Sequence, residues 1–178
     1  MFDRKFSGLI DIADLGQTGM ITLRCNLADA QISRAITDAE FEVPTQRQKA
    51  GSSLWMSPDE LMILTAYESV EAQVSVLQTA LKEHHNFIVN VSDARSVFRL
   101  TGADAVLRDV LAKLAPADLD PQSLPMGEVR RTRLAQVAAA FWFESEGVAQ
   151  LICFRSVSDY VFDLLSNAAS EDSAVGYF

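Results

Sequence analysis

The chain has few cysteines and few histidines, which limits the metal and redox chemistry it can carry. Its cysteines, Cys25 and Cys153, lie far apart in apolar, strand-like stretches. The sequence therefore predicts buried thiols rather than a disulfide or a metal pair. The histidines, His84 and His85, are adjacent at the end of a predicted helix, where neighbouring side chains point about 100° apart. We expect structural or exposed histidines and no metal site.

Positive charge is also scarce, and no long apolar run is present. There are 15 Lys and Arg against 24 Asp and Glu, giving a formal net charge of -9 and a pI near 4.6. Proteins that bind phosphate backbones need clustered Lys and Arg, so we expect no nucleic acid partner. No apolar run approaches the about 18 to 20 residues of a membrane span, and the start, MFDRKFSGLIDIADLG, is acidic where a signal peptide is apolar. We expect no membrane contact and a cytoplasmic location.

Common catalytic and cofactor motifs are missing as well. The sequence contains no G-x-G-x-x-G, G-x-x-x-x-G-K-[ST], H-E-x-x-H or G-x-S-x-G. Its many carboxylates form no pair in an apolar setting that would indicate a tuned acid and base. The sequence therefore predicts no catalytic, cofactor-binding or metal-ligating residue on this chain.

What is present is the composition of a packed globular protein. Hydrophobic residues make up 49% of the chain, with only 8 Gly and 5 Pro. A length of 178 residues allows one sizeable core or two small ones. We expect either a single compact domain over 1–178 or two closely packed α/β subunits split near 45–55. A flexible tail is expected over 170–178.

Hydrophobic periodicity predicts strands that alternate with helices. Strands are expected over 20–27, 87–91 and 96–100, and helices over 28–40, 69–85, 158–169 and from Gly102 to near Leu114. A polar loop over 42–53 precedes a hairpin over 54–66, and a longer hairpin joins 130–144 to 148–155. This order predicts an α+β fold with a mainly antiparallel sheet and helices on one face.

Two strand-to-helix joints have the form [ST]-x-x-D. Thr101 precedes Asp104 in the first joint, and Ser156 precedes Asp159 in the second. This spacing predicts a capping box at each helix start. The first joint also has Gly102, but a phosphate cradle needs several glycines, and Asp104 occupies the place of the anion. We therefore expect capped joints and no phosphate site.

A basic run stands out in the otherwise acidic chain. Arg130, Arg131 and Arg133 follow Glu128, and alternation along a strand puts Arg131 and Arg133 on one face. The run is either a solvated strand end or a contact with an acidic partner surface, since Arg is favoured in interfaces.

The ordered segments LWMSPDELMIL, VNVSDARSVFRLTGADA, DLDPQSLPMGEVRRTRL and CFRSVSDYVFDLL resemble the gamma subunit family of heterotetrameric sarcosine oxidase. In that family the hairpin usually reads tryptophan, small residue, glycine, proline, aspartate, glutamate, tryptophan. The chain matches it at Trp55 and at Pro58-Asp59-Glu60, and departs from it at Ser57 and Leu61. The departures lie in a hairpin and affect no expected chemistry.

The resemblance implies a subunit of a bacterial complex that demethylates sarcosine to glycine, with transfer of the one-carbon unit to tetrahydrofolate and of electrons to oxygen. FAD, FMN, NAD and tetrahydrofolate would then be held by partner subunits among alpha, beta and delta. It also implies a fold similar to the folate-binding domain of glycine-cleavage aminomethyltransferase. We expect a non-catalytic structural subunit whose candidate partner contacts are Trp55, Arg130, Arg131, Arg133 and Trp142.

Two other interpretations stay open at this point. The fold likeness also allows a free-standing folate-binding or aminomethyltransferase-like protein. A homo-oligomeric domain with an unrelated function is the third interpretation.

Overall fold

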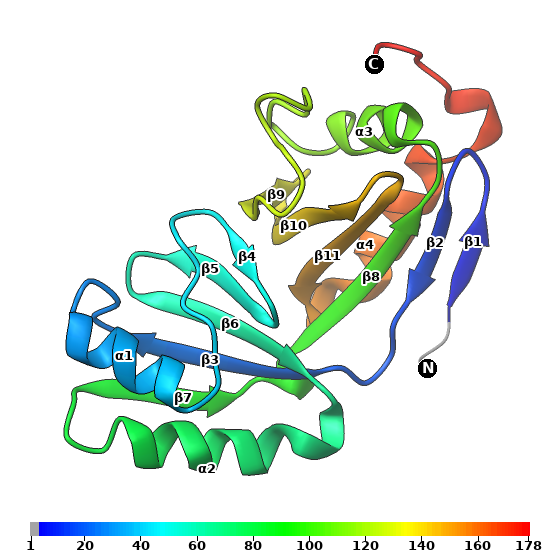
Figure 1. Ribbon diagram of the computed structural model, residues 1–178. Helices are drawn as coiled ribbons and strands as arrows, with labels where there is room; N and C mark the ends of the chain where they lie inside the picture. Colours follow the sequence, from blue (N-terminus) through cyan, green and yellow to red (C-terminus); the bar gives the residue numbers. More distant parts are fainter. Residues whose placement is uncertain (1–3) are drawn as a thin grey trace. The chain divides into compact units, whose positions relative to one another are not determined.

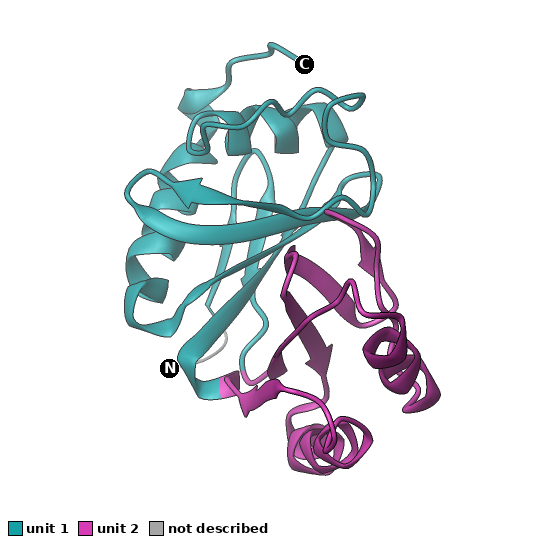
Figure 2. Cartoon of the chain, turned by 90° about the vertical axis from the view of Figure 1, so that its left-hand side faces the viewer, with its two compact units in different colours: residues 1–16, 93–178 teal, residues 17–92 magenta. Residues whose placement is uncertain are grey.

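The computed structural model describes residues 4–178, and its contacts divide the chain into two compact units. The first unit contains the residues up to Gly16 and those from Asp93 onward, and the second runs from Gln17 to Ser92 (Figure 2). The boundaries therefore lie at these points and not near 45–55. Residues 45–55 contain short strands that pair inside the second unit, so a boundary there would cut its sheet.

The second unit is a five-stranded sheet with two helices (Figure 1). The strand order is β4-β5-β6-β3-β7, and every pair is antiparallel. The elements are β3 (Gly19–Cys25), α1 (Ala30–Asp38), β4 (Lys49–Ala50), β5 (Ser53–Ser57), β6 (Glu60–Thr65), η1 (Tyr67–Ser69), α2 (Val70–Ala80) and β7 (Asn86–Asn90). A short 3-10 turn, η2 (Ser92–Ala94), follows β7.

The first unit is a six-stranded sheet with order β1-β2-β8-β11-β10-β9, again antiparallel throughout. Its N-terminal hairpin consists of β1 (Lys5–Ser7) and β2 (Asp11–Asp14). The later elements are β8 (Arg95–Thr101), α3 (Asp104–Ala112), β9 (Arg130–Leu134), β10 (Val137–Ser145), β11 (Val148–Phe154), η3 (Arg155–Val157), α4 (Ser158–Ala168) and η4 (Glu171–Ser173).

Each unit has its own apolar core between the sheet and its two helices. In the second unit, the predicted stripe of α2 packs on the sheet through Val70, Val74 and Leu77. In the first unit, α3 and α4 pack on alternate residues of β8, β10 and β11, including Phe98, Phe141 and Leu151. These alternating and helical stripes are the patterns from which the elements were predicted. The α+β expectation, with helices on one face of an antiparallel sheet, is confirmed.

The strand expected over 130–144 is wrong, because the chain turns back within it. Ala135 has φ 48°, and β9 pairs with β10 in a tight hairpin through Leu134 and Val137. Left-handed backbone of this kind usually involves Gly or Asn, so the sequence Leu-Ala-Gln-Val contains no turn signal.

The two predicted capping boxes are also wrong. Helix α3 begins at Asp104 with Ala103 as N-cap, and α4 begins at Ser158 with Val157 as N-cap, so neither start has a side-chain cap. Thr101 still belongs to β8, and Ser156 lies in the 3-10 turn η3. Each acidic residue therefore stands too early in its helix to occupy the third helical position.

The C-terminal residues contact α3. The Asp109 carboxylate accepts hydrogen bonds from the backbone N–H groups of Gly176 and Tyr177 at 2.8 and 3.1 Å. The Lys113 ammonium donates to the carbonyl of Ala168 at 2.8 Å. Ala168 is the last residue of α4 and shortly precedes η4. The stretch 170–178, predicted as a flexible tail, thus includes η4 and these anchored residues.

Candidate partner-binding surface

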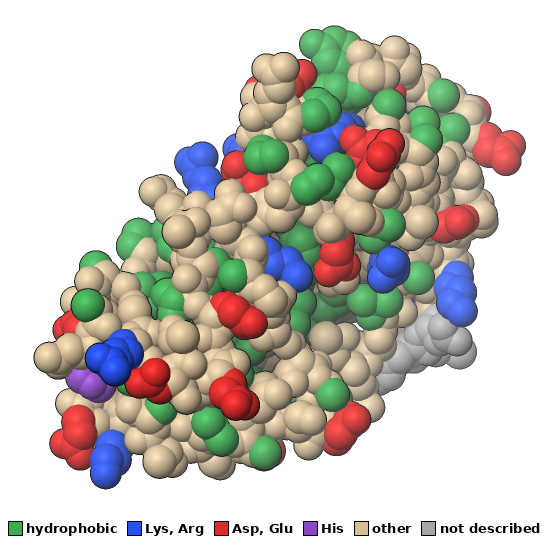
Figure 3. All heavy atoms as spheres, in the orientation of Figure 1, with side chains coloured by type: hydrophobic (Ala, Val, Ile, Leu, Met, Phe, Trp, Pro, Cys, Tyr) green, Lys and Arg blue, Asp and Glu red, His purple; other side chains and the backbone are tan. Residues whose placement is uncertain are grey.

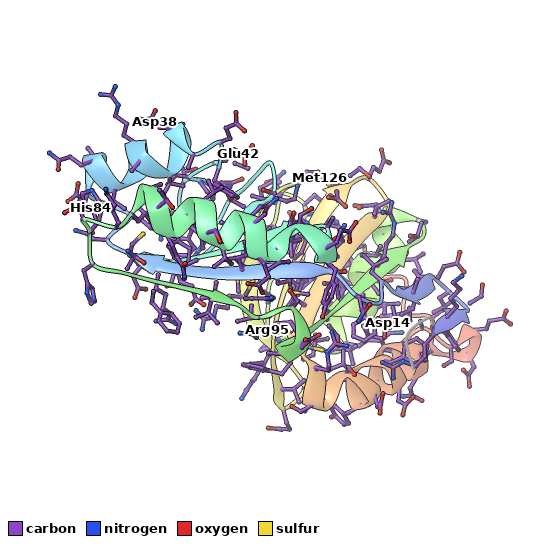
Figure 4. The ribbon with its side chains drawn as sticks, turned by 90° about the horizontal axis from the view of Figure 1, so that it is seen from below. Asp14, Asp38, Glu42, His84, Arg95 and Met126 are labelled. Atoms are coloured by element: carbon purple, nitrogen blue, oxygen red, sulfur yellow. The ribbon has the colours of Figure 1, made fainter. Side chains whose placement is uncertain are left out.

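The titratable groups of the chain are mostly engaged in structural contacts. Among the described residues, no group of three or more His, Cys, Asp or Glu could hold a metal ion. No helix in residues 4–178 is long and apolar enough to cross a membrane. His84, labelled in Figure 4, lies after α2, and its carbonyl accepts from the Asn86 side chain at 2.9 Å.

The cysteines are free and buried, as predicted. Burial raises the pKa of Cys25 to about 11, with a further contribution from Asp59. Burial also raises the pKa of Cys153 to about 11, with Asp14 adding to the effect. Both thiols are neutral near pH 7, so neither is an activated nucleophile.

The acidic residue of the Gly102 joint, Asp104, takes part in contacts that hold the loop after α3. Asp104 pairs with the Arg108 guanidinium at 2.7 Å and also accepts from the Gly147 N–H at 3.3 Å. Arg108 is 1% exposed, and it donates to the carbonyls of Leu119 and Leu124 at 2.6 and 3.3 Å. Its guanidinium also lies over the Phe143 ring. The acidic residue that follows Gly102 is thus committed to holding the segment after α3.

Arginines gather on the face of the six-stranded sheet that points away from α3 and α4. In β9, Arg131 and Arg133 stand opposite Ala140 and Ala138 of β10, whereas Leu134 belongs to the core on the helix side. In β8, Phe98 and Leu100 belong to that same core, so Arg99 points to the opposite face. We call this side the arginine face, defined by Arg95, Arg99, Arg131 and Arg133.

The strand register places these arginines around an aromatic centre. Arg99 pairs with Gln150, which pairs with Trp142, so the three share one row across the sheet. Arg95 pairs with Phe154 in a row nearer the other end, and its guanidinium lies 3.9 Å from the centroid of the Phe154 ring. Phe154 is 44% exposed. Phe154 is thus an accessible aromatic residue at this end of the face, whereas Trp142 is fully buried.

Two of the four arginines on the arginine face, Arg99 and Arg133, lack an internal counter-ion. Arg99 and Arg133 are exposed, and neither makes a hydrogen bond or an ion pair with any residue in 4–178. Glu144 also lies on this face, but its carboxylate accepts from the Gln150 amide. Elsewhere, acidic side chains are scattered over the surface seen in Figure 3 and form no single patch. Arg95 and Arg131 of the same face do have interaction partners.

The other predicted contact residues do not all join this face. Arg130 points to the helix side, where it pairs with Glu128 at 2.9 Å and donates to the Ser123 carbonyl at 3.1 Å. Trp55 belongs to β5 of the second unit, opposite Leu61, and is half-buried. Trp142 shares the arginine face but is fully buried, and its indole N–H has no partner among the described residues. The structure therefore brings together Arg131, Arg133 and Trp142 only.

Sequence reasoning missed Arg95 and Arg99. The signal was the alternation in ARSVFRL, where Arg95, Val97 and Arg99 fall on one side and Ser96, Phe98 and Leu100 on the other. Only the sheet order puts β8 and β9 in one sheet, since they are separated by β11 and β10. Which residues of β8 and β9 share a face therefore depends on the tertiary fold and cannot be read from either strand alone.

A family model and a related protein of known function both match this chain, and they name the same family. The model of the sarcosine oxidase, gamma subunit family matches residues 25–171. The sarcosine oxidase subunit gamma of Corynebacterium sp. strain U-96 is 33% identical over 121 residues, covering 68% of this chain. The alignment spans 57% of that relative's own length.

Solved structures agree on the fold. A chain of the heterotetrameric sarcosine oxidase from Corynebacterium sp. U-96, in complex with pyrrole 2-carboxylate, has a TM-score of 0.83 at 25% identity. That match covers 96% of this chain and 90% of the other. The glycine cleavage system aminomethyltransferase T from Bartonella henselae has a TM-score of 0.60 at 13% identity, covering 86% of this chain and 44% of that one. The second likeness confirms the expected fold.

Proposed function

This chain belongs to the sarcosine oxidase gamma subunit family, and on that premise we propose that it is a structural subunit of a heterotetrameric sarcosine oxidase. The observation that carries the proposal is the match to a chain of such an oxidase over 96% of this chain and 90% of the other. Nearly the whole fold is therefore shared with a chain that is found in that assembly.

The proposed complex divides its chemistry among other chains. It would demethylate sarcosine to glycine, with FAD, FMN, NAD and tetrahydrofolate held by partner subunits of alpha, beta and delta type, in the cytoplasm. The chemistry of this chain's own groups supports that division. Its cysteines are neutral thiols, and the carboxylates of Asp104 and Asp109 are bound to Arg108 and to backbone N–H groups. Groups committed in this way are poorly suited to proton transfer.

Contact with the partners is proposed at Arg131 and Arg133, the exposed β9 arginines that the sequence analysis named. Arg130 is assigned to holding the loop before β9, because its guanidinium is occupied by Glu128 and the Ser123 carbonyl. The half-buried Trp55 is retained as a separate candidate contact on the second unit. Trp142 is not retained as a direct contact, since its side chain is fully buried.

Co-expression tests the proposal directly. The chain is produced with the alpha, beta and delta subunits of a sarcosine oxidase, and the complex is isolated through a tag on alpha. We expect this chain in equal amount with alpha, and a lower yield and melting temperature when it is omitted. A fully stable complex that forms without it, or one that never retains it, would contradict the proposal.

A second candidate function is a free-standing folate-binding protein, supported by the fold likeness to aminomethyltransferase T. Isothermal titration of the isolated chain with tetrahydrofolate distinguishes it from the leading proposal. Saturable heat at a one-to-one ratio would favour folate binding, and the structural proposal predicts none.

A further inference from the structure

The four strands at the sheet edges differ in how they are protected against pairing with another strand. In the first unit, β1 has three residues and includes Lys5, and β9 includes Arg130, Arg131 and Arg133. In the second unit, β4 has two residues, one of them Lys49, whereas β7 has five residues and no charge (Figure 1). Short length and basic side chains are common means by which an edge strand avoids pairing. Among the edges of the described sheets, only β7 lacks both.

The backbone of β7 presents a regular set of hydrogen-bonding groups on its outer side. The Val91 N–H donates to the Met20 carbonyl at 2.8 Å, directly beyond the paired residues of β7 and β3. In an antiparallel pair every second residue bonds to the partner strand, so the backbone groups of Phe87 and Val89 point toward β3. The N–H and C=O groups that point outward therefore belong to the alternate residues, Asn86, Ile88 and Asn90.

The sequence of β7, Asn-Phe-Ile-Val-Asn, is complementary to itself in the opposite direction. When two copies lie antiparallel with Ile88 opposite Ile88, Asn86 lies opposite Asn90, and Phe87 lies opposite Val89. This is the one register that pairs every outward backbone group of both strands.

The side chains of β7 suit the same register. Ile88 belongs to the core on the helix side, so Phe87 and Val89 lie on the other face of the sheet. Phe87 is 57% exposed. Opposing an aromatic to a β-branched side chain is a favourable cross-strand pair, and the two-fold symmetry forms it twice. Because β7 is uncharged, no like charges come to lie directly opposite each other.

We propose that β7 pairs antiparallel with β7 of a second copy of this chain, across a two-fold axis at Ile88, so that the two five-stranded sheets become continuous. The inference goes beyond the proposed function, because it concerns contact between two copies of this chain. The contact is isologous, since each strand receives the same groups that it offers. A pair of five-residue strands is small beside the about 1,200 Å² of a stable interface, so the dimer is weak and concentration-dependent.

Cysteine cross-linking tests the register. The full chain is made as Phe87→Cys and as Val89→Cys with different tags, and the two are mixed and mildly oxidised. Opposite residues of this kind lie about 4.5 Å apart between Cα atoms, within reach of a disulfide. The matched control mixes Val89→Cys with Val76→Cys, an exposed residue of α2 beside α1. Wild type gives the background, because Cys25 and Cys153 are buried.

We expect a cross-linked dimer that carries both tags in the first mixture, and only background in the control and in each variant alone. Equal cross-linking in the control mixture would overturn the inference. So would equal cross-linking of Phe87→Cys alone, because in the proposed register the two Phe87 positions lie too far apart for a disulfide.

Sedimentation equilibrium of the full chain provides a second measurement. We expect the mass of wild type to rise toward that of a dimer with concentration, and Phe87→Lys to weaken the association about 5 to 30 times. Its melting temperature at low concentration should match wild type, because Phe87 is exposed. A wild-type chain that stays monomeric, or a dimer that Phe87→Lys does not weaken, would contradict the inference. Co-expression with the oxidase subunits is measured separately, so the inference and the proposed function can fail independently.

Discussion

The two units of the chain arrange corresponding elements in the same order but complete their sheets differently. In the second unit, β3, α1, β4, β5, β6 and α2 are followed by β7, which pairs with β3. In the first unit, β8, α3, β9, β10, β11 and α4 occur in the same order, but the place beside β8 is taken by β2 from the N-terminal end. One sheet is thus completed by a strand from its own continuous segment, and the other by a strand from before the second unit in the sequence.

The difference extends to the sheet edges. Strand β1 covers β2 in the first unit, whereas β7 is an edge strand in the second and exposes 57% of Phe87. Residue Ile12 of β2 pairs with Leu100, so the first core depends on contacts that span the whole second unit in sequence. Such long-range pairing carries a larger loop-closure cost than the pairing of β3 with β7.

The largest expected effects come from matched core truncations in β8 and β3. Leu100→Ala in the first unit and Leu23→Ala in the second each empty a fully buried site. We expect each to lower the free energy of unfolding by about 2 to 5 kcal/mol. Urea unfolding checks this through the chain's two tryptophans, Trp142 in the first unit and Trp55 in the second. Losses below about 1 kcal/mol would contradict the assignment of both sites to well-packed cores.

The next comparison concerns corresponding helices, each with an Arg–Asp pair at four-residue spacing. Arg108 of α3 is buried and holds Asp104, Leu119 and Leu124, whereas the Arg34–Asp38 pair of α1 is 83% and 71% exposed. We expect Arg108→Met to cost about 1.5 to 3 kcal/mol, because buried carbonyls lose their donor. Arg34→Ala should cost less than about 0.5 kcal/mol. Equal losses in the free energy of unfolding, measured in urea, would show that the difference in burial does not change how much each pair stabilises the chain.

Helix starts provide a smaller effect that tests the corrected caps. Asp29 caps α1 by accepting from the Gln31 N–H at 2.8 Å, whereas α3 has no side-chain cap. We expect Asp29→Ala to cost about 1 kcal/mol, and Thr101→Ala to cost less than about 0.5 kcal/mol. Chemical unfolding of the two variants in parallel measures both losses in the free energy of unfolding. A larger loss for Thr101→Ala would show that Thr101 caps α3 after all.

The smallest effect near neutral pH concerns the cysteines. The folded pKa of Cys153 is raised to about 11 from 9.0, so the unfolded thiol ionises first as pH rises. Stability linked to this thiol is therefore fully present below pH 9 and is lost between about 9 and 11. We expect wild type to lose more stability than Cys153→Ala over that interval, measured by urea unfolding at each pH. Parallel curves would contradict the raised pKa.

Most helices and strands could be predicted from the local spacing of apolar residues, because the apolar residues of each stripe are the ones buried in the core. The stripe of α2 was predicted from the spacing of Val70, Val74, Leu77 and Leu81, and the hairpin between β5 and β6 from the turn residues 57–60. The unit boundaries were not, since the place of β2 beside β8 is decided by pairing between segments far apart in sequence. The turn at Ala135 escaped because its left-handed backbone carries no glycine.

The candidate surface was predictable only in part for the same reason. Alternation correctly placed Arg131 and Arg133 together, because that relation is local to one strand. Arg130 failed to join them, since neighbouring residues in a strand point to opposite faces. The burial of Trp142 and the presence of Arg99 on the same face required the register of β8, β11 and β10.

The central claim is that this chain stabilises a sarcosine oxidase without taking part in its chemistry, and reconstitution tests it most directly. Purified chain is added back to a complex that lacks it, and both the melting temperature and the kcat for sarcosine per assembled flavin are measured. We predict that addition raises the melting temperature while kcat per flavin stays constant. A kcat that depends on the chain, with an unchanged melting temperature, would contradict the account.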